Sequence, residues 1–288
     1  MLMTDREGKR VRSKKNNKVI GSVIVYIILI FLALMMLVPF AWMISASLKF
    51  NKDVFVIPFE WISKEPRWKN YIDIWTKIPL AKFTLNTVKL TLIVTGLQLL
   101  TSSFAAYAFA KLQFKGKNVL FLAYVSTIAV PWQVYMVPQF MFMRKLGLAD
   151  THLAIIILQA FSAFGVFLMR QFYEGIPDSL CEAARIDGMS EYKIYSTIML
   201  PLSKPALSTL IIFTFVNTWN DFLGPLIYLT TESKKTLQIG LKMFISQYSA
   251  EYGLIMAASV LSLIPVFVVF LSLQKYFVAG ITTGSVKG

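Results

Sequence analysis

Few side chains of this sequence could bind a metal ion or a phosphate group. The 288 residues contain one histidine, His152, and one cysteine, Cys181. Because a site built from these ligands needs three or four of them, the chain cannot form one by itself. A phosphate loop of the form G-x-x-x-x-G-K-[ST] is absent, since Gly116-Lys117-Asn118 lacks the leading glycine and the hydroxyl residue. We therefore expect no catalytic residue, no metal and no cofactor in this chain.

Asp221 is the one charged residue deep inside an apolar stretch. Thr214, Asn217 and Asp221 follow the i, i+3, i+7 spacing that places side chains on one helix face. A charge at the centre of a bilayer costs about 2.5–3.5 kcal/mol, so such groups usually face a bundle interior or a watery cavity. Two interpretations stay open. This face, together with Asn220, lines a polar route across a membrane, or Asp221 is a structural bridge between helices.

The segment 173–204 is a long, organised loop between apolar stretches. Ser179 is followed three positions later by Glu182, the spacing of a capping box, which predicts that a helix starts there. Gly188 suits the position just after a helix, where a left-handed backbone conformation is common. The first half of the loop therefore reads as a short helix that ends in a tight turn.

The second half of the loop predicts another helix. Ser190 can cap a helix over 191–199, and Pro201 is expected to end it. The small side chains of Ala183 and Ala184 in the preceding helix leave room for side chains of a partner. We expect a compact helix–turn–helix at the protein surface.

The composition places these residues in a membrane protein. Hydrophobic residues make up 56% of the chain and charged residues 15%, whereas soluble domains have about 45–50% and about 25%. A soluble enzyme and a disordered chain are both excluded. The net charge of +14 is then better explained by basic loops that face anionic lipid than by nucleic acid.

Long charge-free stretches define the elements, because a helix needs about 20 apolar residues to cross a bilayer. They predict an all-α membrane protein in which residues 1–18 form an N-terminal segment and 19–288 the membrane domain. The first apolar stretch is too long for a signal peptide and is expected to be a retained anchor. Six spans are predicted, over 19–44, 84–109, 119–142, 152–172, 205–230 and 254–277.

Basic residues predict the orientation of these spans. Seven of the first 18 residues are Lys or Arg, and the short loop 110–118 contains three Lys and no acid. Short basic loops stay in the cytoplasm. Both termini and the loop 173–204 are therefore expected on the cytoplasmic side, and 45–83, 143–151 and 231–253 outside.

The loop resembles the EAA signature of binding-protein-dependent ABC importer permeases. Six spans with this loop before the last two, and the run Trp219-Asn220-Asp221-Phe222, resemble the maltose-type, MalG-like carbohydrate permeases in particular. The match to the signature is Glu182-Ala183-Ala184-x-x-Asp187-Gly188, nine further residues, and then Ile198-x-Leu200-Pro201.

This resemblance implies a function and a set of partners. The chain is expected to form part of the pathway for a sugar or oligosaccharide, which an external binding protein delivers. It would work in a bacterial plasma membrane with a second, homologous permease and a cytoplasmic ATPase dimer that binds ATP and Mg. The loop would be the coupling helix that docks on the ATPase, and Glu182 would meet an Arg there, although Glu182 could also only cap its own helix. The coupling residues implied are Glu182, Ala183, Ala184, Asp187, Gly188, Ile198, Leu200 and Pro201.

Two other classes fit the sequence less well. A secondary transporter or channel often has paired charges within its spans or broken-helix repeats, and we find one Asp and no repeat. A membrane enzyme would need clustered His, Asp or Glu, and no such cluster occurs. The identity of the sugar stays open.

Overall fold

The protein is helical and folds as two compact units. The computed structural model describes the backbone of residues 3–245 and 251–285 and the side chains of 21–245 and 251–276. One unit comprises 1–71 with 251–260, and the other comprises 72–250 with 261–288. Every regular element in the described ranges is a helix. Part of the predicted outer segment 231–253, residues 246–250, lies outside them.

The first unit joins a long helix to an irregular segment. Its elements are α1 (Met3–Ser47), η1 (Asn51–Asp53), the start of α2 (Asn70–Lys77) and the start of α14 (Tyr252–Ser285). The buried side chain of Asn70 donates hydrogen bonds of 2.9 Å to the carbonyl oxygens of Ser47 and Lys49. A Cβ at Gly253 would lie 2.8 Å from the Lys49 oxygen, so only glycine lets α14 start against this turn.

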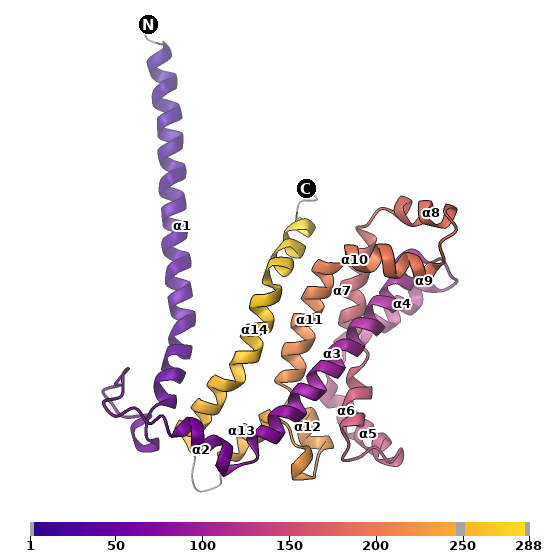
Figure 1. Cartoon of the computed structure of the whole chain (residues 1–288). Helices are drawn as coiled ribbons and strands as arrows, with labels where there is room; N and C mark the ends of the chain where they lie inside the picture. The colour runs from indigo at the N-terminus through magenta and orange to yellow at the C-terminus, as the bar shows by residue number, and fades with distance from the viewer. Residues whose placement is uncertain (1–2, 246–250, 286–288) are drawn as a thin grey trace. The chain divides into compact units, whose positions relative to one another are not determined.

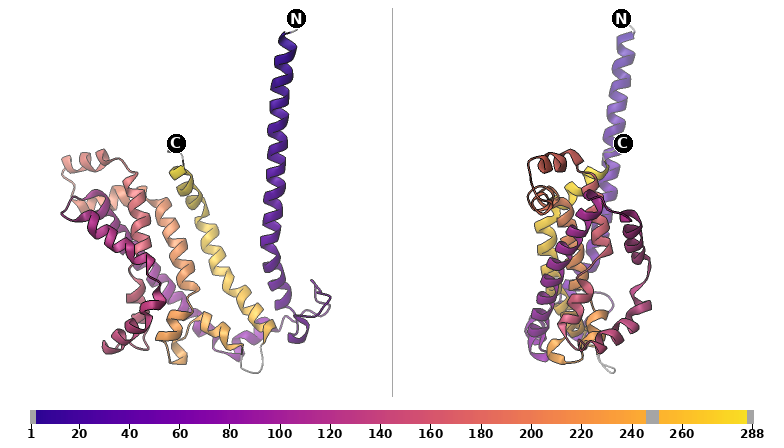
Figure 2. Two further views of the ribbon diagram at one scale, coloured as in Figure 1. Left: turned by 180° about the vertical axis from the view of Figure 1, so that it is seen from behind. Right: turned by 90° about the vertical axis from the view of Figure 1, so that its right-hand side faces the viewer.

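The second unit is a helix bundle arranged around α3 (Figure 1). Among its helices α3 packs most extensively against α7 and α11. Short helices gather at its two ends, with α8 and α9 at one and α12 and α13 at the other, as the views in Figure 2 also show. Its longer helices are α3 (Leu80–Lys111), α4 (Lys117–Ser126), α5 (Trp132–Lys145), α6 (His152–Gln159), α7 (Ala163–Glu174), α8 (Asp178–Ile186) and α11 (Lys204–Trp219). Its shorter helices are η2 (Thr127–Ala129), α9 (Glu191–Ile194), η3 (Tyr195–Met199), α10 (Leu200–Leu202), α12 (Leu223–Tyr228), η4 (Glu232–Lys234) and α13 (Leu237–Met243).

Four of the predicted spans correspond to helices long and apolar enough to cross a membrane. They are Gly21–Ser47, Leu80–Lys111, His152–Glu174 and Tyr252–Tyr276. α1 runs without interruption from Met3, so the predicted boundary at residue 18 stays a prediction. The described residues contain up to six such spans if each of two bent helix pairs counts as one.

The predicted span 119–142 is strongly bent. Its two parts, Lys117–Ala129 and Trp132–Lys145, are bent by 101°. The break falls at Pro131, and Val130 before it is extended, with φ −89° and ψ 111°. This is the conformation that a following proline favours, because its ring clashes with a helical residue in front of it.

The predicted span 205–230 is also interrupted. α11 ends at Trp219, residues 220–222 are not helical, and α12 begins at Leu223. The Asp221 carboxylate accepts a 3.0 Å hydrogen bond from the backbone N–H of Gly224. This bond satisfies a backbone donor in the first turn of α12, as the side chain of an N-cap residue does. Upstream, Glu191–Leu202 and α11 form the second bent pair, at 78°.

Two clusters of buried side chains hold the second unit together. One connects α3, α7 and α11 to the helices 178–202 and includes Tyr107, Met169, Tyr173, Ile194 and Leu210. The other lies toward the opposite end and includes Leu90, Met143, Ile155, Tyr228 and Leu229. Each end of the bundle therefore has its own packed core, and a candidate site lies beside each.

Candidate functional site

The first site is the hairpin formed by residues 178–202 (Figure 1). Gly188 adopts φ +78°, which confirms the predicted left-handed turn. The Ser190 hydroxyl accepts a 3.4 Å hydrogen bond from the Lys193 N–H, and the predicted cap of the second helix is thereby confirmed. The hairpin is a helix–turn–helix, as the sequence indicates.

The ends of these two helices differ from the prediction. α8 begins at Asp178, directly after an extended Pro177, and has no side-chain cap. Ser179 therefore lies inside the helix, and its predicted capping box with Glu182 is wrong; Asp178 at the positive end of the helix dipole favours this start. The second helix does not end before Pro201 either, because it continues through a π-helical turn and α10 to Leu202.

Polar contacts fasten the hairpin to α3. The Arg185 guanidinium donates to the Glu191 carboxylate at 2.7 Å, and the Tyr107 hydroxyl of α3 donates to the same carboxylate at 2.5 Å. Lys111 at the end of α3 forms an ion pair of 2.5 Å with Asp178, and this hydrogen bond holds the pKa of the Asp178 carboxyl below its usual value. Both helices of the hairpin are thus bonded to one long helix.

The signature residues divide between the two faces of the hairpin. Glu182, Ala183, Asp187, Gly188 and Pro201 are exposed. Ala184 is only 4% exposed and packs into the core of the bundle, so the expectation that it leaves room for a partner is wrong. Ile198 and Leu200 are half-buried and pack against the same core.

The structure adds two apolar side chains to the outer face. Ile186 is 86% exposed and Tyr192 is 79% exposed. Sequence reasoning missed both. The helical period could have predicted that Ile186 is exposed once Ala184 is known to be buried, because a residue two positions further on lies on nearly the opposite side of a helix.

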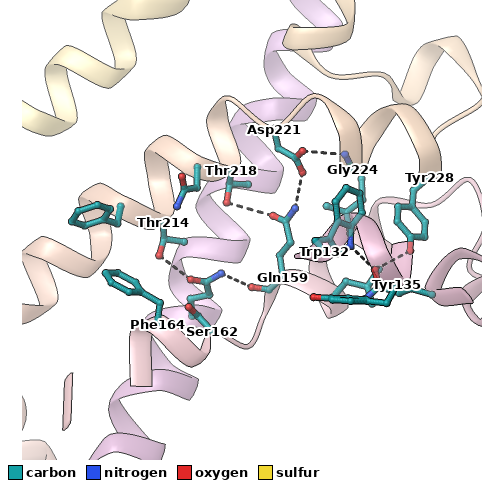
Figure 3. A pocket seen from close by; sticks show the side chains of 16 residues that line it. Trp132, Tyr135, Gln159, Ser162, Phe164, Thr214, Thr218, Asp221, Gly224 and Tyr228 are labelled. Atoms are coloured by element: carbon teal, nitrogen blue, oxygen red, sulfur yellow. Dashed lines mark hydrogen bonds between the residues drawn. The ribbon is translucent and has the colours of Figure 1, made fainter. Parts of the chain in front are cut away.

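The second site is a pocket of about 860 Å³ near the other end of the same unit (Figure 3). The breaks after α6 and α11 both reach it, because Ser162 and Asp221 are among its lining residues. Its lining is Gln98, Trp132, Tyr135, Gln139, Ile155, Leu158, Gln159, Ser162, Phe164, Phe213, Thr214, Asn217, Thr218, Asp221, Gly224 and Tyr228.

A chain of hydrogen bonds crosses the pocket wall (Figure 3). Thr214 donates to the Gln98 side chain at 2.9 Å, and Gln98 donates to the Gln159 carbonyl oxygen at 2.7 Å. Gln159 in turn donates to Asp221 Oδ2 at 2.7 Å. The two helix breaks are therefore tied to each other and to α3.

Thr214, Asn217 and Asp221 all line the pocket, but they do not share one helix face as predicted, because α11 ends at Trp219 and Asp221 lies in the interruption that follows. Asp221 bridges helices through Gln159, as the structural interpretation predicts, and the route across a membrane stays a prediction. The structure places Asn220 elsewhere: its amide donates to the Val216 carbonyl oxygen at 2.9 Å and accepts from Gln238 at 3.2 Å.

Several pocket residues were missed by sequence reasoning. Gln98 and Gln159 are uncharged polar residues inside the charge-free stretches 90–110 and 151–169. Their polarity within apolar stretches could have identified them from the sequence, since an amide within an apolar span requires a hydrogen-bond partner. Trp132 and Tyr135 gave no such signal, because aromatic residues are also common at membrane interfaces.

Together, these features define a multi-span helical membrane protein with a surface hairpin at one end of a bundle and a polar pocket toward the other. The chain belongs to the family of inner membrane components of binding-protein-dependent transport systems, whose pattern matches residues 98–283.

Comparisons with individual proteins agree with this family. The chain is 40% identical over 207 residues to the arabinooligosaccharides transport permease AraQ of Bacillus subtilis strain 168, covering 72% of this chain and 74% of that one. It is 31% identical over 265 residues to the lactose transport permease LacG of Rhizobium radiobacter, covering 92% and 96%. A bacterial ABC transporter that imports the acidic polysaccharide alginate has a similar structure, with a TM-score of 0.79, 27% identity and coverage of 90% and 96%.

Proposed function

We propose that this protein is the permease subunit of an ATP-driven importer and forms part of the pathway for a sugar or oligosaccharide. Family membership supports the transport role, and relatives named for arabinooligosaccharides, lactose and melibiose support a sugar as cargo. The observation that carries the proposal is one bundle with a signature hairpin at one end and a pocket toward the other.

The hairpin is the proposed docking element for the ATPase. Its outer face combines a carboxylate at Glu182 with the exposed Ile186 and Tyr192. An apolar centre beside a charge suits a protein interface, and Glu182 is a ligand for an Arg of the partner. ATP and Mg are bound by that partner.

α3 is the proposed route by which the hairpin acts on the pocket. One unbroken helix carries both Tyr107, which is bonded to the hairpin, and Gln98, which is bonded within the pocket wall. Their separation of nine positions corresponds to about 13.5 Å of helix. Movement of the hairpin on ATPase closure would therefore tilt α3 as a rod and change the pocket, in the manner of other rigid-body switches.

The remaining parts of the proposal follow from this role. A second, homologous permease completes the pathway, two ATPase subunits hold the two coupling hairpins, and an external binding protein delivers the sugar. The complex lies in a bacterial plasma membrane, with both termini and the hairpin on the cytoplasmic side.

Charge reversal at Glu182 tests the proposal. In the importer reconstituted with its ATPase and binding protein, Glu182→Lys should lower ATP-dependent uptake of radiolabelled arabinotriose at least about tenfold, because facing like charges cost several kcal/mol. Glu232→Lys, the same change at an exposed carboxylate of η4, which lies in the sequence between α12 and α13 at the other end of the bundle, is the control and should leave uptake near wild type. Equal uptake by the two variants, at equal amounts in the membrane, would overturn the docking assignment.

A further inference from the structure

We infer that this chain itself contacts the transported sugar in the pocket, and that the pocket favours uncharged sugars over acidic ones. The inference rests on the proposed function and adds the charge class of the cargo. It stands on the charges, the free polar groups and the aromatic rings that line the pocket.

The pocket has no cation to receive an acidic group. None of its lining residues, within the described part of the chain, is Lys, Arg or His. Its one charge is Asp221, whose two oxygens accept hydrogen bonds from Gln159 and from the Gly224 N–H. These bonds suit an ionised carboxylate, which only accepts. A carboxylate on the cargo would therefore meet a like charge without a partner, and such repulsion is strong in a low-dielectric site.

Uncharged hydroxyl groups find partners in the same pocket. The amide of Asn217, the hydroxyl of Tyr135 and the amide nitrogen of Gln139 line it without a hydrogen bond inside the described part of the chain. An amide both donates and accepts, as a sugar hydroxyl does. These groups are consequently available to the cargo, in contrast to the occupied Asp221 and Gln98.

Aromatic rings flank these polar groups. Gln139 Oε1 accepts from Trp132 Nε1 at 2.9 Å and from the Tyr228 hydroxyl at 3.3 Å, and so fixes two rings. Figure 3 shows Trp132, Tyr135 and Tyr228 on one side of the Gln159–Asp221 bridge and Phe164 on the other. The C–H face of a pyranose or furanose is apolar and packs against such rings, while the hydroxyls at its edge face the amides.

The dimensions agree with a sugar ligand. The volume of about 860 Å³ lies within the roughly 300–1,000 Å³ of small-molecule sites. Rigid aromatic rings and a few convergent polar groups are also the usual composition of such sites. Since the groups that carry the inference all come from the second unit, with Tyr135 and Gln139 on α5 and Asn217 on α11, they belong to this chain and not to a partner.

The test compares a neutral and an acidic trisaccharide. Radiolabelled arabinotriose and trigalacturonate are measured by equilibrium binding to the purified full importer, with the binding protein omitted so that its selectivity does not enter. The wild type should bind arabinotriose at least about tenfold more tightly, the range that pocket contacts provide. Asn217→Lys, which adds a cation inside the pocket, should shift the ratio toward trigalacturonate at least about tenfold.

The matched control is Asn220→Lys, the same change one turn away and outside the pocket lining, which should leave the ratio unchanged. Tyr135→Lys adds a cation at a second lining position and replaces Asn217→Lys if that variant does not assemble. Equal binding of the two sugars by the wild type, or the same ratio in the Asn217, Tyr135 and Asn220 variants, overturns the inference. Failure of the proposed function is distinct: the wild type, with ATP and binding protein, would then import neither sugar.

Discussion

Asp150 shows how one side chain can organise a segment of the second unit. Its backbone adopts φ +55°, a left-handed conformation that Asp tolerates better than most residues. Its carboxylate accepts from the N–H groups of Thr230 and Thr231, from the Thr231 hydroxyl and from Lys234. Tyr228, at the end of the pocket, accepts from the Asp150 N–H at 3.0 Å. One residue thus links the loop after α5 to the segment that follows α12.

This arrangement predicts a pH dependence. The hydrogen bonds from Thr231 and Lys234 lower the pKa of the Asp150 carboxyl, so the folded loop is stabilised above the unfolded pKa of about 3.9. That stabilisation is lost as the pH falls through the lower, folded pKa. Hydrogen exchange of the Thr230 and Thr231 amides should be faster in Asp150→Asn than in the wild type at pH 7, and the difference should shrink in acid. Identical exchange at pH 7 would contradict the role of Asp150.

At the scale of elements, Glu191 is the junction between the hairpin and α3. Arg185 of α8 and Tyr107 of α3 both donate to its carboxylate. The Tyr195 hydroxyl, from the same side of the hairpin, lies 2.6 Å from Ser103 Oγ of α3. Hydrogen bonds to charged groups contribute about 1.5–3 kcal/mol each, so the Tyr107–Glu191 bond is a substantial part of an attachment that also includes the Lys111–Asp178 ion pair and the Tyr195–Ser103 bond.

We expect Glu191→Gln to loosen this attachment while the buried apolar core keeps the hairpin folded. The sugar imported per ATP hydrolysed should fall several-fold, because ATPase closure would move the hairpin without moving α3 to the same extent. Uptake and hydrolysis measured in the same vesicles give this ratio, and Glu232→Gln serves as the control. An unchanged ratio for Glu191→Gln would contradict the role of Glu191 in connecting the hairpin to α3.

At the scale of the whole molecule, the proposed orientation rests on basic residues rather than on packing. The N-terminal 18 residues and the loop 110–118 are both rich in Lys and Arg, and such segments stay in the cytoplasm. The segment 110–118 begins in the last turn of α3, and its Lys111 binds Asp178 of the hairpin. The hairpin therefore belongs on the same side as that loop.

Reporter fusions test this orientation. An enzyme that is active only in the cytoplasm should be active when it is fused after Gly288 and silent when it is inserted within 60–70. Both results follow if six segments cross the membrane, since an even number returns the chain to its starting side. The reverse pattern would refute the span count and the side assigned to the hairpin, and expression of each fusion is checked by immunoblot.

The sequence by itself determined the continuous apolar helices, the left-handed turn at Gly188 and the shared helix face of Thr214 and Asn217. These features depend on hydropathy and helical period, which are local in the chain. It also identified Asp221 as a residue that needs a partner, but it could not say which one.

Only the tertiary structure decided which residues distant in the sequence contact one another. Gln159 is 62 positions from Asp221 and Gln98 is 116 from Thr214, and no local pattern specifies such pairings. The same holds for Ala184, which suits an interface by its size but is buried because α8 packs against α9 and Ala184 joins the core cluster that includes Tyr107 and Tyr173. The interruption at 220–222 likewise depends on distant contacts, because Asp221 is held by Gln159 on one side and stabilises the start of α12 on the other.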